Sequence, residues 1–463
     1  MTYHVAIDIG ASSGRVILAK KENKRLDLQE IYRFKNGFSK IDGYDRWDMD
    51  WLVENVLTGL EKVKKYGVET CTVGIDTWAV DYCLLDYSGN ILAQPIAYRD
   101  KRTQGAMEKI FQQLSQGDIY KKTGIQFLQF NTLYQLSVED RTLLDKADKI
   151  LMIPDYIAYC LTGKKVGEVT NWSTSQLLNL KTHTYDQDLL TILQISEDKF
   201  PKLIEAGEVI GELAVSGYDL PQAQIIAVGT HDTASAVVGV PATSKNWAYI
   251  SSGTWSLIGM EEKLPLVNDQ TYEANYTNEW GVYHTYRLLK NITGMWCLQE
   301  IARLTDYQFS YKEMAEQAEK IPPFLQEIDL TDDRFTNPEN MIEEIKAACR
   351  ETQQTIPETI GELVMCVYSN LAKIYGRELK KLEALTGKTI DCLHIVGGGS
   401  NVDLLNQLTA NVIEKEVIAG PGEATAIGNI LVQMITMGEF ENLPQARHWL
   451  EALSCFESYK PQI

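Results

Sequence analysis

The sequence predicts an α/β protein built from two similar lobes around a cleft. The chain has 463 residues, which is too long for one ordinary hydrophobic core and suits two domains of roughly 200 residues each. Strand-like apolar segments alternate with helix-like segments, as in mixed or parallel sheets. Each half also opens with a hairpin whose turn is small and hydroxyl-rich, GASSG in the first half and SSGT in the second.

The first half is predicted to form three strands, a helix and two further strands. The strand segments are apolar and rich in β-branched residues. In Met49–Lys65 the apolar residues fall on one face at helical spacing, which predicts an amphipathic helix. The strands are expected at residues 3–9, 15–20, 26–34, 71–76 and 79–86.

The second half repeats this order loosely. A hairpin is expected at its start, and a strand that ends in three glycines precedes a helix from about residue 402. We expect the boundary between the lobes near residues 240–245, with one domain over residues 1–240 and the other over 241–463. Further strands are expected at residues 246–250, 255–260, 392–396 and 416–419, and a further helix at 423–435.

Composition and charge exclude several kinds of partner. The formal net charge is −19 and the sequence pI is about 4.9, so the surface repels nucleic acid and anionic lipid. No apolar run approaches the roughly 18 residues that a membrane span needs, and we expect no charged-then-apolar leader before the first strand. The surface also repels ATP, so a nucleotide site must be made from backbone amides, a cation and a bound metal. We expect a cytoplasmic protein, a monomer or a weak homo-oligomer.

The eight cysteines form neither a disulfide framework nor a metal site by their spacing. There is no C-x-x-C pair and no combination of cysteine with histidine at metal-ligand spacing. They are typical of reduced, mostly buried thiols in a cytosolic protein. Cys349 and Cys366 could meet across two packed helices, a pairing that spacing alone leaves open.

The strongest local motif is DIGASSGR, from Asp8 to Arg15. A carboxylate closes a strand, and a turn of small residues then exposes backbone N–H groups that can bind phosphate oxygens. Ser12 and Ser13 add hydroxyl donors, Arg15 adds a fixed cation, and Asp8 could hold Mg²⁺ through water. A hairpin turn with a buried aspartate explains the same residues equally well. The motif is neither a Walker loop nor a dinucleotide fingerprint.

Weaker motifs occur in the second half. SSGTWS, at residues 251–256, repeats the small turn; alone it indicates an ordinary β-turn, and it gains weight from its matching place in a repeated lobe. Two such turns facing each other would hold a triphosphate from both sides. VGGGS, at 396–400, permits close approach of an adenosine, although a tight turn is the commoner meaning of three glycines. GPGEATAIG, at 420–428, favours a crowded, ligand-facing end of the second lobe.

THDTASA, at residues 230–236, follows the apolar segment IIAVG. A carboxylate at the end of a strand is well placed to take a proton from a sugar hydroxyl, and His231 and Thr233 could bind neighbouring hydroxyls. Asp232 also suits the N-cap of a helix, where its pKa would be lowered. Polar and aromatic residues at 76–81, 98–100 and 129–134 are typical of sugar pockets, and equally of cores and surfaces.

Motifs spread in order along the chain resemble the FGGY family of carbohydrate kinases, which belongs to the superfamily of actin, hexokinase and the heat-shock ATPases. DIGASSGR and SSGTWSLIG resemble phosphate turns of the whole superfamily, whereas GIDTWAVD, FNTLYQL and HDTASAV resemble the L-rhamnulose branch of the family. The resemblance runs from about Ala6 to about Val432. It implies two ribonuclease-H-like, actin-type lobes, each with a βββαβ core, around a cleft for ATP and sugar.

The resemblance also implies roles for single residues. Asp232 would be the proton acceptor, and His231, Thr233, Asn291 and the backbone at Ala79 would contact the sugar. Residues 1–240 would bind the sugar and the phosphates, and residues 241–463 the nucleotide. The implied ATP-binding residues are Ala11, Ser12, Ser13, Gly14, Arg15, Thr254, Gln299 and Gly398.

The implied reaction transfers the γ-phosphoryl group of ATP, with Mg²⁺, to the 1-hydroxyl of L-rhamnulose, giving L-rhamnulose 1-phosphate and ADP in L-rhamnose catabolism. One alternative is a kinase for another ketose, L-fuculose, L-xylulose or D-xylulose. Another is a non-catalytic ATP-dependent scaffold, which the HDTASA motif disfavours because a scaffold needs no base. Two residues depart from the familiar motifs: Ala79 replaces the glycine of TWGVD, and Ser251 replaces the aspartate that commonly begins the second phosphate motif.

Overall fold

The chain divides into two compact units in the computed structural model, which describes residues 2–22, 25–336, 338–453 and 456–462. The first unit contains Met1–Pro241, Glu261–Leu288 and Thr425–Leu453, and the second contains Ala242–Met260, Leu289–Ala424 and Ser454–Ile463. The first unit therefore recruits two segments from the second half of the sequence. Among the described residues, no helix is both long and apolar enough to cross a membrane.

The first unit is organised around a six-stranded sheet of order β11-β12-β6-β1-β2-β3. The strands β1, β2 and β3 are antiparallel neighbours, whereas β6 runs parallel to both β1 and β12. The C-terminal ends of β1, β6 and β12 therefore lie at the same edge of the sheet. The bounds are β1 (Tyr3–Ile9), β2 (Ser13–Glu22), β3 (Arg25–Lys35), β6 (Thr70–Thr77), β11 (Val209–Glu212) and β12 (Gln222–Ile226).

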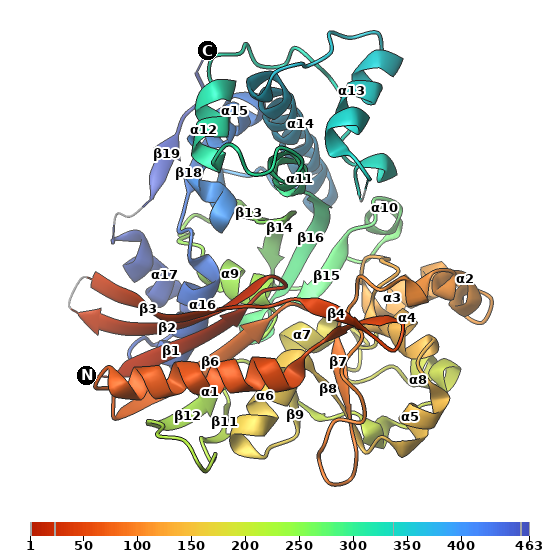
Figure 1. Ribbon diagram of the computed structural model, residues 1–463, viewed down its shortest axis with the longest axis vertical. Coiled ribbons are helices and arrows are strands. Elements are labelled where there is room, and N and C mark those ends of the chain that lie inside the picture. The colour runs from red at the N-terminus through yellow and green to blue at the C-terminus, as the bar shows by residue number, and fades with distance from the viewer. Residues whose placement is uncertain (1, 23–24, 337, 454–455, 463) are drawn as a thin grey trace. The chain divides into compact units, whose positions relative to one another are not determined.

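Helices cover both faces of this sheet (Figure 1). On one face, α1 (Met49–Lys65) and α6 (Ile153–Thr162) pack against the alternate apolar residues of the strands, such as Val5, Ile7 and Val73. The residues between them, such as Thr72, point to the other face, where α9 (Asp232–Val238) and α16 (Ala424–Thr436) lie. The helix α17 (Leu443–Glu451) follows α16 in the same unit.

A second hydrophobic core in the first unit lies beside the sheet. It includes Tyr134, Trp172 and Trp280, and it is built mainly from short helices between β6 and β12. The remaining elements of the unit are β4 (Phe38–Ile41), β5 (Tyr44–Trp47), β7 (Tyr82–Leu85), α2 (Ala106–Phe111), α3 (Gln116–Thr123), α4 (Thr132–Ser137), α5 (Arg141–Lys146), β8 (Lys149–Met152), β9 (Val166–Glu168), α7 (Val169–Ser173), α8 (Gln187–Leu193), β10 (Lys202–Ile204) and α10 (Asp269–Glu273).

The second sheet has the order β15-β16-β14-β13-β17-β18-β19. In the second unit the long helix α14 packs against α12 and α15 (Figure 1). The bounds are β13 (Trp247–Ser252), β14 (Trp255–Glu262), β15 (Thr277–Trp280), β16 (Tyr286–Thr293), α11 (Trp296–Leu304), α12 (Tyr311–Ala318), α13 (Met341–Glu351), α14 (Ile360–Thr386), β17 (Cys392–Val396), α15 (Asp403–Ile413), β18 (Glu416–Ala419) and β19 (Glu457–Tyr459).

Both sheets share one strand order, which confirms the predicted α/β fold with a repeated core. The order β3-β2-β1-β6-β12 of the first sheet matches β16-β14-β13-β17-β18 of the second. In each case an antiparallel hairpin is followed by a helix and then by a parallel strand beside the first strand of the hairpin. The expected cleft between the lobes, and the boundary expected near residue 240, stay predictions.

Most predicted elements are confirmed within one or two residues, including α1, β17 and β18. The strand expected at residues 79–86 is wrong at its start, because Val80 has a φ of 68° and the amide of Asp81 donates to the carbonyl of Ala79 at 2.9 Å. The strand β7 therefore begins only at Tyr82.

None of the described cysteines forms a disulfide. The thiols of Cys349 on α13 and Cys366 on α14 are close enough for each to shift the pKa of the other, and they form no disulfide. Cys455 lies outside the described residues.

Candidate active site

Three carboxylates gather at the edge of the first sheet where β1, β6 and β12 end. Asp8 is the penultimate residue of β1, and its register partner on β6 is Asp76. Asp232 begins α9, after the loop that follows β12. Burial raises the pKa of both other carboxyls and the charge of Asp8 adds to this, so the three groups interact electrostatically. The edge thus offers carboxyl oxygens, which are the ligands that hard cations such as Mg²⁺ prefer.

The predicted phosphate turn connects β1 to β2. It is closed by a hydrogen bond from the amide of Gly10 to the carbonyl of Ser13, at 2.9 Å, and Ser12 at its tip is exposed. Arg15 pairs with Asp8 across the hairpin, with 2.5 Å between Nη2 and Oδ2. Gly14 is required by packing, since a Cβ there would lie 2.1 Å from the ring of Phe34.

Asp76 is fully buried, and only one of its oxygens is satisfied. Asn429 of α16 donates to Oδ2 at 2.6 Å, whereas Oδ1 has no hydrogen-bond partner among the described residues. Burial raises the pKa of Asp76 well above its ordinary value, and the charge of Asp8 raises it further. Gly74, two residues earlier on β6, allows α16 to approach, because a Cβ there would lie 2.3 Å from Asn429 Oδ1.

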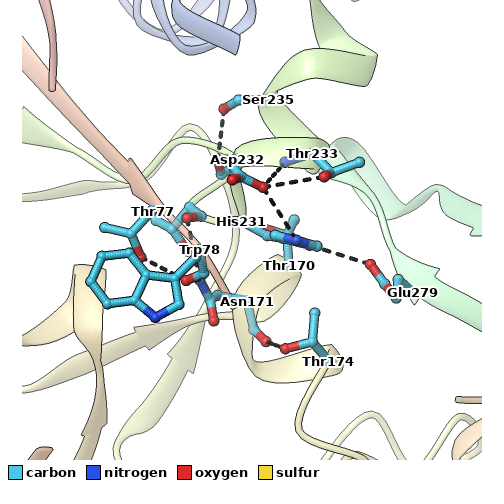
Figure 2. Close-up of polar contacts among 12 residues, drawn as sticks. Thr77, Trp78, Thr170, Asn171, Thr174, His231, Asp232, Thr233, Ser235 and Glu279 are labelled. Atoms are coloured by element: carbon cyan, nitrogen blue, oxygen red, sulfur yellow. Dashed lines mark hydrogen bonds and ion pairs between the residues drawn. The ribbon is translucent and has the colours of Figure 1, made fainter. Parts of the chain in front are cut away.

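The loop that carries Asp232 is fastened to the end of β6 (Figure 2). The amide of Thr77 donates to the carbonyl of Thr230 at 2.9 Å, and Thr77 forms a parallel bridge with His231. Glu168, which is fully buried, accepts hydrogen bonds from the amide and the hydroxyl of Thr230 at 3.1 and 2.7 Å. Burial raises the pKa of Glu168 to about 7. The loop is thus held from both sides.

The two oxygens of Asp232 have different surroundings. Oδ1 accepts hydrogen bonds from the amide of Thr233 at 2.6 Å and from its hydroxyl at 3.2 Å, and it lies 3.4 Å from Nε2 of His231. Oδ2 makes no hydrogen bond to the described part of the chain, and 33% of the side chain is exposed. The arrangement leaves one carboxylate oxygen able to accept a proton from a bound hydroxyl group.

The expectation that Asp232 caps its helix and has a lowered pKa is wrong. His231 is the N-cap residue of α9, and Asp232 is the first residue inside the helix. Burial raises the pKa of Asp232, and the charge of Asp8 adds to this, while His231 and the amide of Thr233 act in the opposite direction.

His231 lies between two carboxylates, those of Asp232 and Glu279 (Figure 2). Its Nδ1 is 3.2 Å from Oε2 of Glu279 and 3.1 Å from Nη2 of Arg287. Arg287 is fully buried and forms an ion pair with Glu279 at 3.0 Å. Burial alone would raise the pKa of Glu279, but the charge of Arg287 lowers it below its ordinary value.

The residues expected in a sugar pocket surround Asp81. Its carboxylate accepts hydrogen bonds from the indoles of Trp47 and Trp78, at 2.6 and 3.0 Å, from the amide of Tyr98 and from the side chain of Gln135. Burial raises the pKa of Asp81 to about 6, although the hydrogen bonds from these donors act to lower it. Two aromatic pairs result, since the rings of Trp47 and Trp78 lie 4.3 Å apart and Tyr98 packs on Phe130.

In the second unit a cavity of about 730 Å³ unites two predicted nucleotide residues, Gln299 and Gly398. Gly253 of the SSGT turn also lines it, beside residues of α11, α12 and the start of α15. Thr254 is the neighbour of Gly253, and its carbonyl accepts a hydrogen bond from Trp296 at 3.2 Å. The cavity is further lined by Met295, Tyr311, Lys312, Ala315, Glu316, Glu319, Gly399, Asn401, Val402, Asp403 and Leu404.

The three glycines approach the hairpin turn closely. A Cβ on Gly399 would lie 2.0 Å from Oγ of Ser252, whereas a Cβ on Gly398 would meet nothing within 4 Å. Gly397 has a φ of 82°, which only glycine adopts readily. The sequence motif therefore packs the strand end of β17 against the turn between β13 and β14 and leaves Gly398 open to the cavity.

The remaining predicted residues are distributed between the two units. Ala79 is half-buried in the loop before β7, and Asn291 is half-buried in β16 of the second unit. The GPGEATAIG segment runs into α16, which belongs to the first unit from residue 425 onward. There a Cβ on Gly428 would lie 1.8 Å from the carbonyl oxygen of Ser235. This glycine serves helix packing.

Sequence reasoning missed several residues around Asp232. Glu168, Glu279 and Arg287 were not singled out, although all three are charged residues that the folded chain buries. Arg287 stands in the strand-like segment TYRLLKN, and an arginine among apolar strand residues is the one signal that could have marked it. Its partner Glu279 could not have been named, because the pairing depends on the register of neighbouring strands.

Residues 3–239 match the N-terminal domain of the FGGY family of carbohydrate kinases, and residues 248–437 match its C-terminal domain. The chain therefore belongs to the FGGY family of carbohydrate kinases. It is 51% identical over 465 residues to a protein named rhamnulokinase from Lactiplantibacillus plantarum, covering 100% of this chain and 95% of that protein. It is 54% identical over 447 residues to one of the same name from Bacillus subtilis, covering 96% and 92%.

Solved structures show the same fold at low sequence identity. A gluconate kinase from Lactobacillus acidophilus is 18% identical, with a TM-score of 0.81 over 100% of this chain and 94% of that one.

Kinase chemistry typically uses a divalent metal with ATP, and the carboxylate edge of the first sheet fits one. Carboxylate oxygens are the ligands that Mg²⁺ prefers, and Mg²⁺ usually keeps several waters and binds substrate phosphates as well. The unpartnered, buried Oδ1 of Asp76 beside Asp8 is a polar atom that such a hydrated ion would satisfy. No cluster of three or more His, Cys, Asp or Glu side chains within the described ranges is close enough to hold a metal alone.

Proposed function

We propose that this protein transfers the γ-phosphoryl group of ATP to the 1-hydroxyl of L-rhamnulose, giving L-rhamnulose 1-phosphate and ADP in L-rhamnose catabolism. Relatives named rhamnulokinase that match essentially the whole chain at about half identity support the substrate. The observation that carries the chemistry is the free oxygen of Asp232, at the edge of the sheet where two other carboxylates lie.

Asp232 is proposed as the base. Its Oδ1 is occupied by donors from Thr233, so the carboxylate has a fixed orientation and Oδ2 can accept the proton of the primary hydroxyl. Burial raises the pKa of Asp232, which brings the carboxyl group closer to the range of a useful general base. Phosphoryl transfer requires little else of the protein beyond alignment and neutralisation of charge.

The two hairpin turns are proposed to bind the phosphates. Residues Ala11–Arg15 and Thr254 would contact them through amides and hydroxyls that suit phosphate oxygens. Asp8 would hold Mg²⁺ through water, and the bound ion supplies charge neutralisation on the phosphates. The cavity beside Gln299 and Gly398 has room for the adenosine.

The sugar is proposed to bind to residues of both halves of the chain. His231 and Thr233 flank the base, and the backbone at Ala79 and the side chain of Asn291 would contribute further contacts. The aromatic residues around Asp81 supply planar faces of the kind that sugars stack on. Residues 1–240 would then serve the sugar and the phosphates, and residues 241–463 the nucleotide.

We further propose that the enzyme acts in the cytoplasm, as a monomer or weak homo-oligomer. The free thiols of the described cysteines suit a reducing compartment.

A coupled assay of ADP formation tests the proposed substrate. Purified enzyme with ATP and Mg²⁺ is given L-rhamnulose, L-fuculose, L-xylulose or D-xylulose at equal concentrations. The proposal predicts the highest kcat/KM for L-rhamnulose and a product phosphorylated at carbon 1. A higher kcat/KM for another ketose would reject the substrate, and ATP hydrolysis indifferent to every sugar would reject the kinase function.

A further inference from the structure

The imidazole of His231 is almost completely buried and has a different partner at each nitrogen. Nδ1 faces Arg287 and Glu279, at 3.1 and 3.2 Å, and Nε2 faces Oδ1 of Asp232 at 3.4 Å. A neutral imidazole carries one proton, so one nitrogen donates and the other accepts. Which nitrogen carries the proton therefore decides whether the ring attracts or repels the carboxylate of the base.

The contacts of Arg287 decide the position of this proton. A guanidinium has only donors and stays protonated in proteins, so its hydrogen bond to Nδ1 requires Nδ1 to be the acceptor. Oε2 of Glu279 lies within ion-pair distance of Nδ1 and of Arg287, but no described group donates a hydrogen bond to it. The geometry therefore favours the bond from Arg287 over a bond from His231 to Glu279.

The burial of Arg287 is costly, which argues for a specific role. It is fully buried, and its Nη1 has no acceptor among the described residues. Glu279 supplies the compensating charge at 3.0 Å, and the carbonyl of Trp280 accepts from Nε and Nη2 at 3.3 Å. A buried ion pair is weak evidence for stability, because apolar residues of similar volume usually serve stability at least as well.

We propose that Arg287, held by Glu279, is a positioning residue that fixes the proton of His231 on Nε2, so that this nitrogen donates toward Asp232. The inference rests on the proposed function, in which Asp232 is the base. With the proton on Nε2, Oδ1 of Asp232 faces three donors, the amide and hydroxyl of Thr233 and the imidazole. The negative charge of the carboxylate is then stabilised on one side, and Oδ2 keeps its orientation for the sugar hydroxyl.

The position of the proton can be measured without any substrate. Protein with ¹⁵N-labelled histidine is studied by two-bond ¹H–¹⁵N NMR in alkaline buffer, and His231 is assigned by the signals lost in His231→Asn. We expect the pattern of a ring protonated on Nε2. A ring protonated on Nδ1, or an even mixture of both forms, would overturn the proposal.

Variants of Arg287 test the link to the base. Arg287→Met removes the donor, and we expect the Nε2-protonated pattern to be lost and kcat to fall at least about tenfold, a part of the usual contribution of a positioned base. The KM for ATP should stay unchanged. Arg287→Lys keeps a donor and should restore most of the Nε2-protonated NMR pattern and most of kcat. Unchanged kcat in a folded Arg287→Met protein would contradict the positioning role.

Arg447→Met is the matched control. Arg447 is a second buried arginine of the first unit, paired with Glu261 at 2.8 Å. Its loss should lower the unfolding temperature in a similar way and leave the proton of His231 on Nε2. A shifted proton in this control would mean that losing any buried arginine disturbs the ring, which would overturn the assignment to Arg287. If the wild type fails to phosphorylate L-rhamnulose, the proposed function is rejected while the NMR result still decides the proton position.

Discussion

The two sheets share a strand order but differ in the residues at equivalent places along the same edge. In the first sheet the register pairs Asp8 with Asp76, and in the second it pairs Ser251 with Val396. In the first sheet the next strand, β12, leads to the loop that carries Asp232. In the second sheet the next strand, β18, leads to the glycine-rich segment at 420–422. One repeated framework thus presents a charged edge in one sheet and a neutral, glycine-rich edge in the other.

This difference suggests a division of tasks between the repeats. The charged edge carries the proposed base and the carboxyl groups proposed to bind a cation, and the pKa values of Asp76, Glu168 and Asp232 are raised there. The neutral edge offers backbone and space, with a cavity of about 730 Å³ beside Gly398. Changes at the first edge should therefore alter turnover, and changes at the second should alter nucleotide binding.

The largest expected effect is that of Asp232→Asn. The amide keeps the shape of the side chain but cannot accept a proton, so kcat should fall at least about 100-fold, from the usual contribution of a positioned base. The dissociation constant of ADP, measured by calorimetry, should stay close to that of the wild type. Near-normal turnover would reject Asp232 as the base and remove the proposed difference between the edges.

A smaller effect is expected at the neutral edge, where two neighbouring glycines form a matched pair. A methyl group on Gly399 would collide with Ser252, so Gly399→Ala should lower stability by about 1–3 kcal/mol and raise the KM for ATP about tenfold. Gly398→Ala meets no protein atom and should leave the unfolding free energy unchanged while still raising the KM for ATP. Urea unfolding and steady-state kinetics measure both quantities.

The two glycine variants could contradict the proposed division of tasks between the edges in either of two ways. If Gly398→Ala binds ATP as the wild type does, then the adenosine does not lie beside that residue. If Gly399→Ala lowers kcat strongly at saturating ATP, the neutral edge takes part in the chemistry as well as in binding.

The smallest effect concerns the pH dependence of stability in the ligand-free protein. The pKa of Glu168 is about 7 in the folded chain, against an ordinary 4.5. Between these values the folded state keeps a proton that the unfolded state has lost, so stability should fall as the pH rises from about 4.5 to 7, by roughly 1–3 kcal/mol. Glu168→Gln should flatten this slope in urea unfolding at pH 5 and pH 7.5, because glutamine does not titrate.

Glu273→Gln, at an exposed position, is the control for this slope. It should leave the slope unchanged. Asp81, whose pKa is about 6, contributes in the same direction, as do Asp76 and Asp232, so part of the slope should remain in the Glu168 variant. If the wild-type protein gains stability from pH 5 to pH 7.5, the buried carboxyls do not set the pH dependence of its stability.

The fold could be predicted from the sequence because its signals are local. Helix α1 was predicted from apolar residues at helical spacing, and β17 from an apolar run ending in glycines. The strand start at Tyr82 could not be predicted, because the left-handed backbone at Val80 belongs to a valine, which rarely adopts it. Likewise, nothing local in α16 indicates that it packs with the first unit, since that depends on contacts such as Asn429 with Asp76.

The candidate site was predictable where one motif contains the chemistry and unpredictable where distant residues meet. The residues around Asp232 and the phosphate turn are contiguous in sequence. The support of His231 comes from Glu279 and Arg287, about 50 residues away, and that of Thr230 from Glu168. The pKa of Asp232 was expected in the wrong direction, because burial and the charge of Asp8 are properties of the folded chain.

A crystal structure with L-rhamnulose and a non-hydrolysable ATP analogue tests the central claim most directly. The measurement is the distance from Oδ2 of Asp232 to the oxygen of the sugar's 1-hydroxyl. We predict a hydrogen bond of about 2.6–3.2 Å, the range a general base requires, with the γ-phosphoryl group next to the same oxygen. A sugar hydroxyl bound to another carboxylate, with Asp232 turned away from it, would contradict the account.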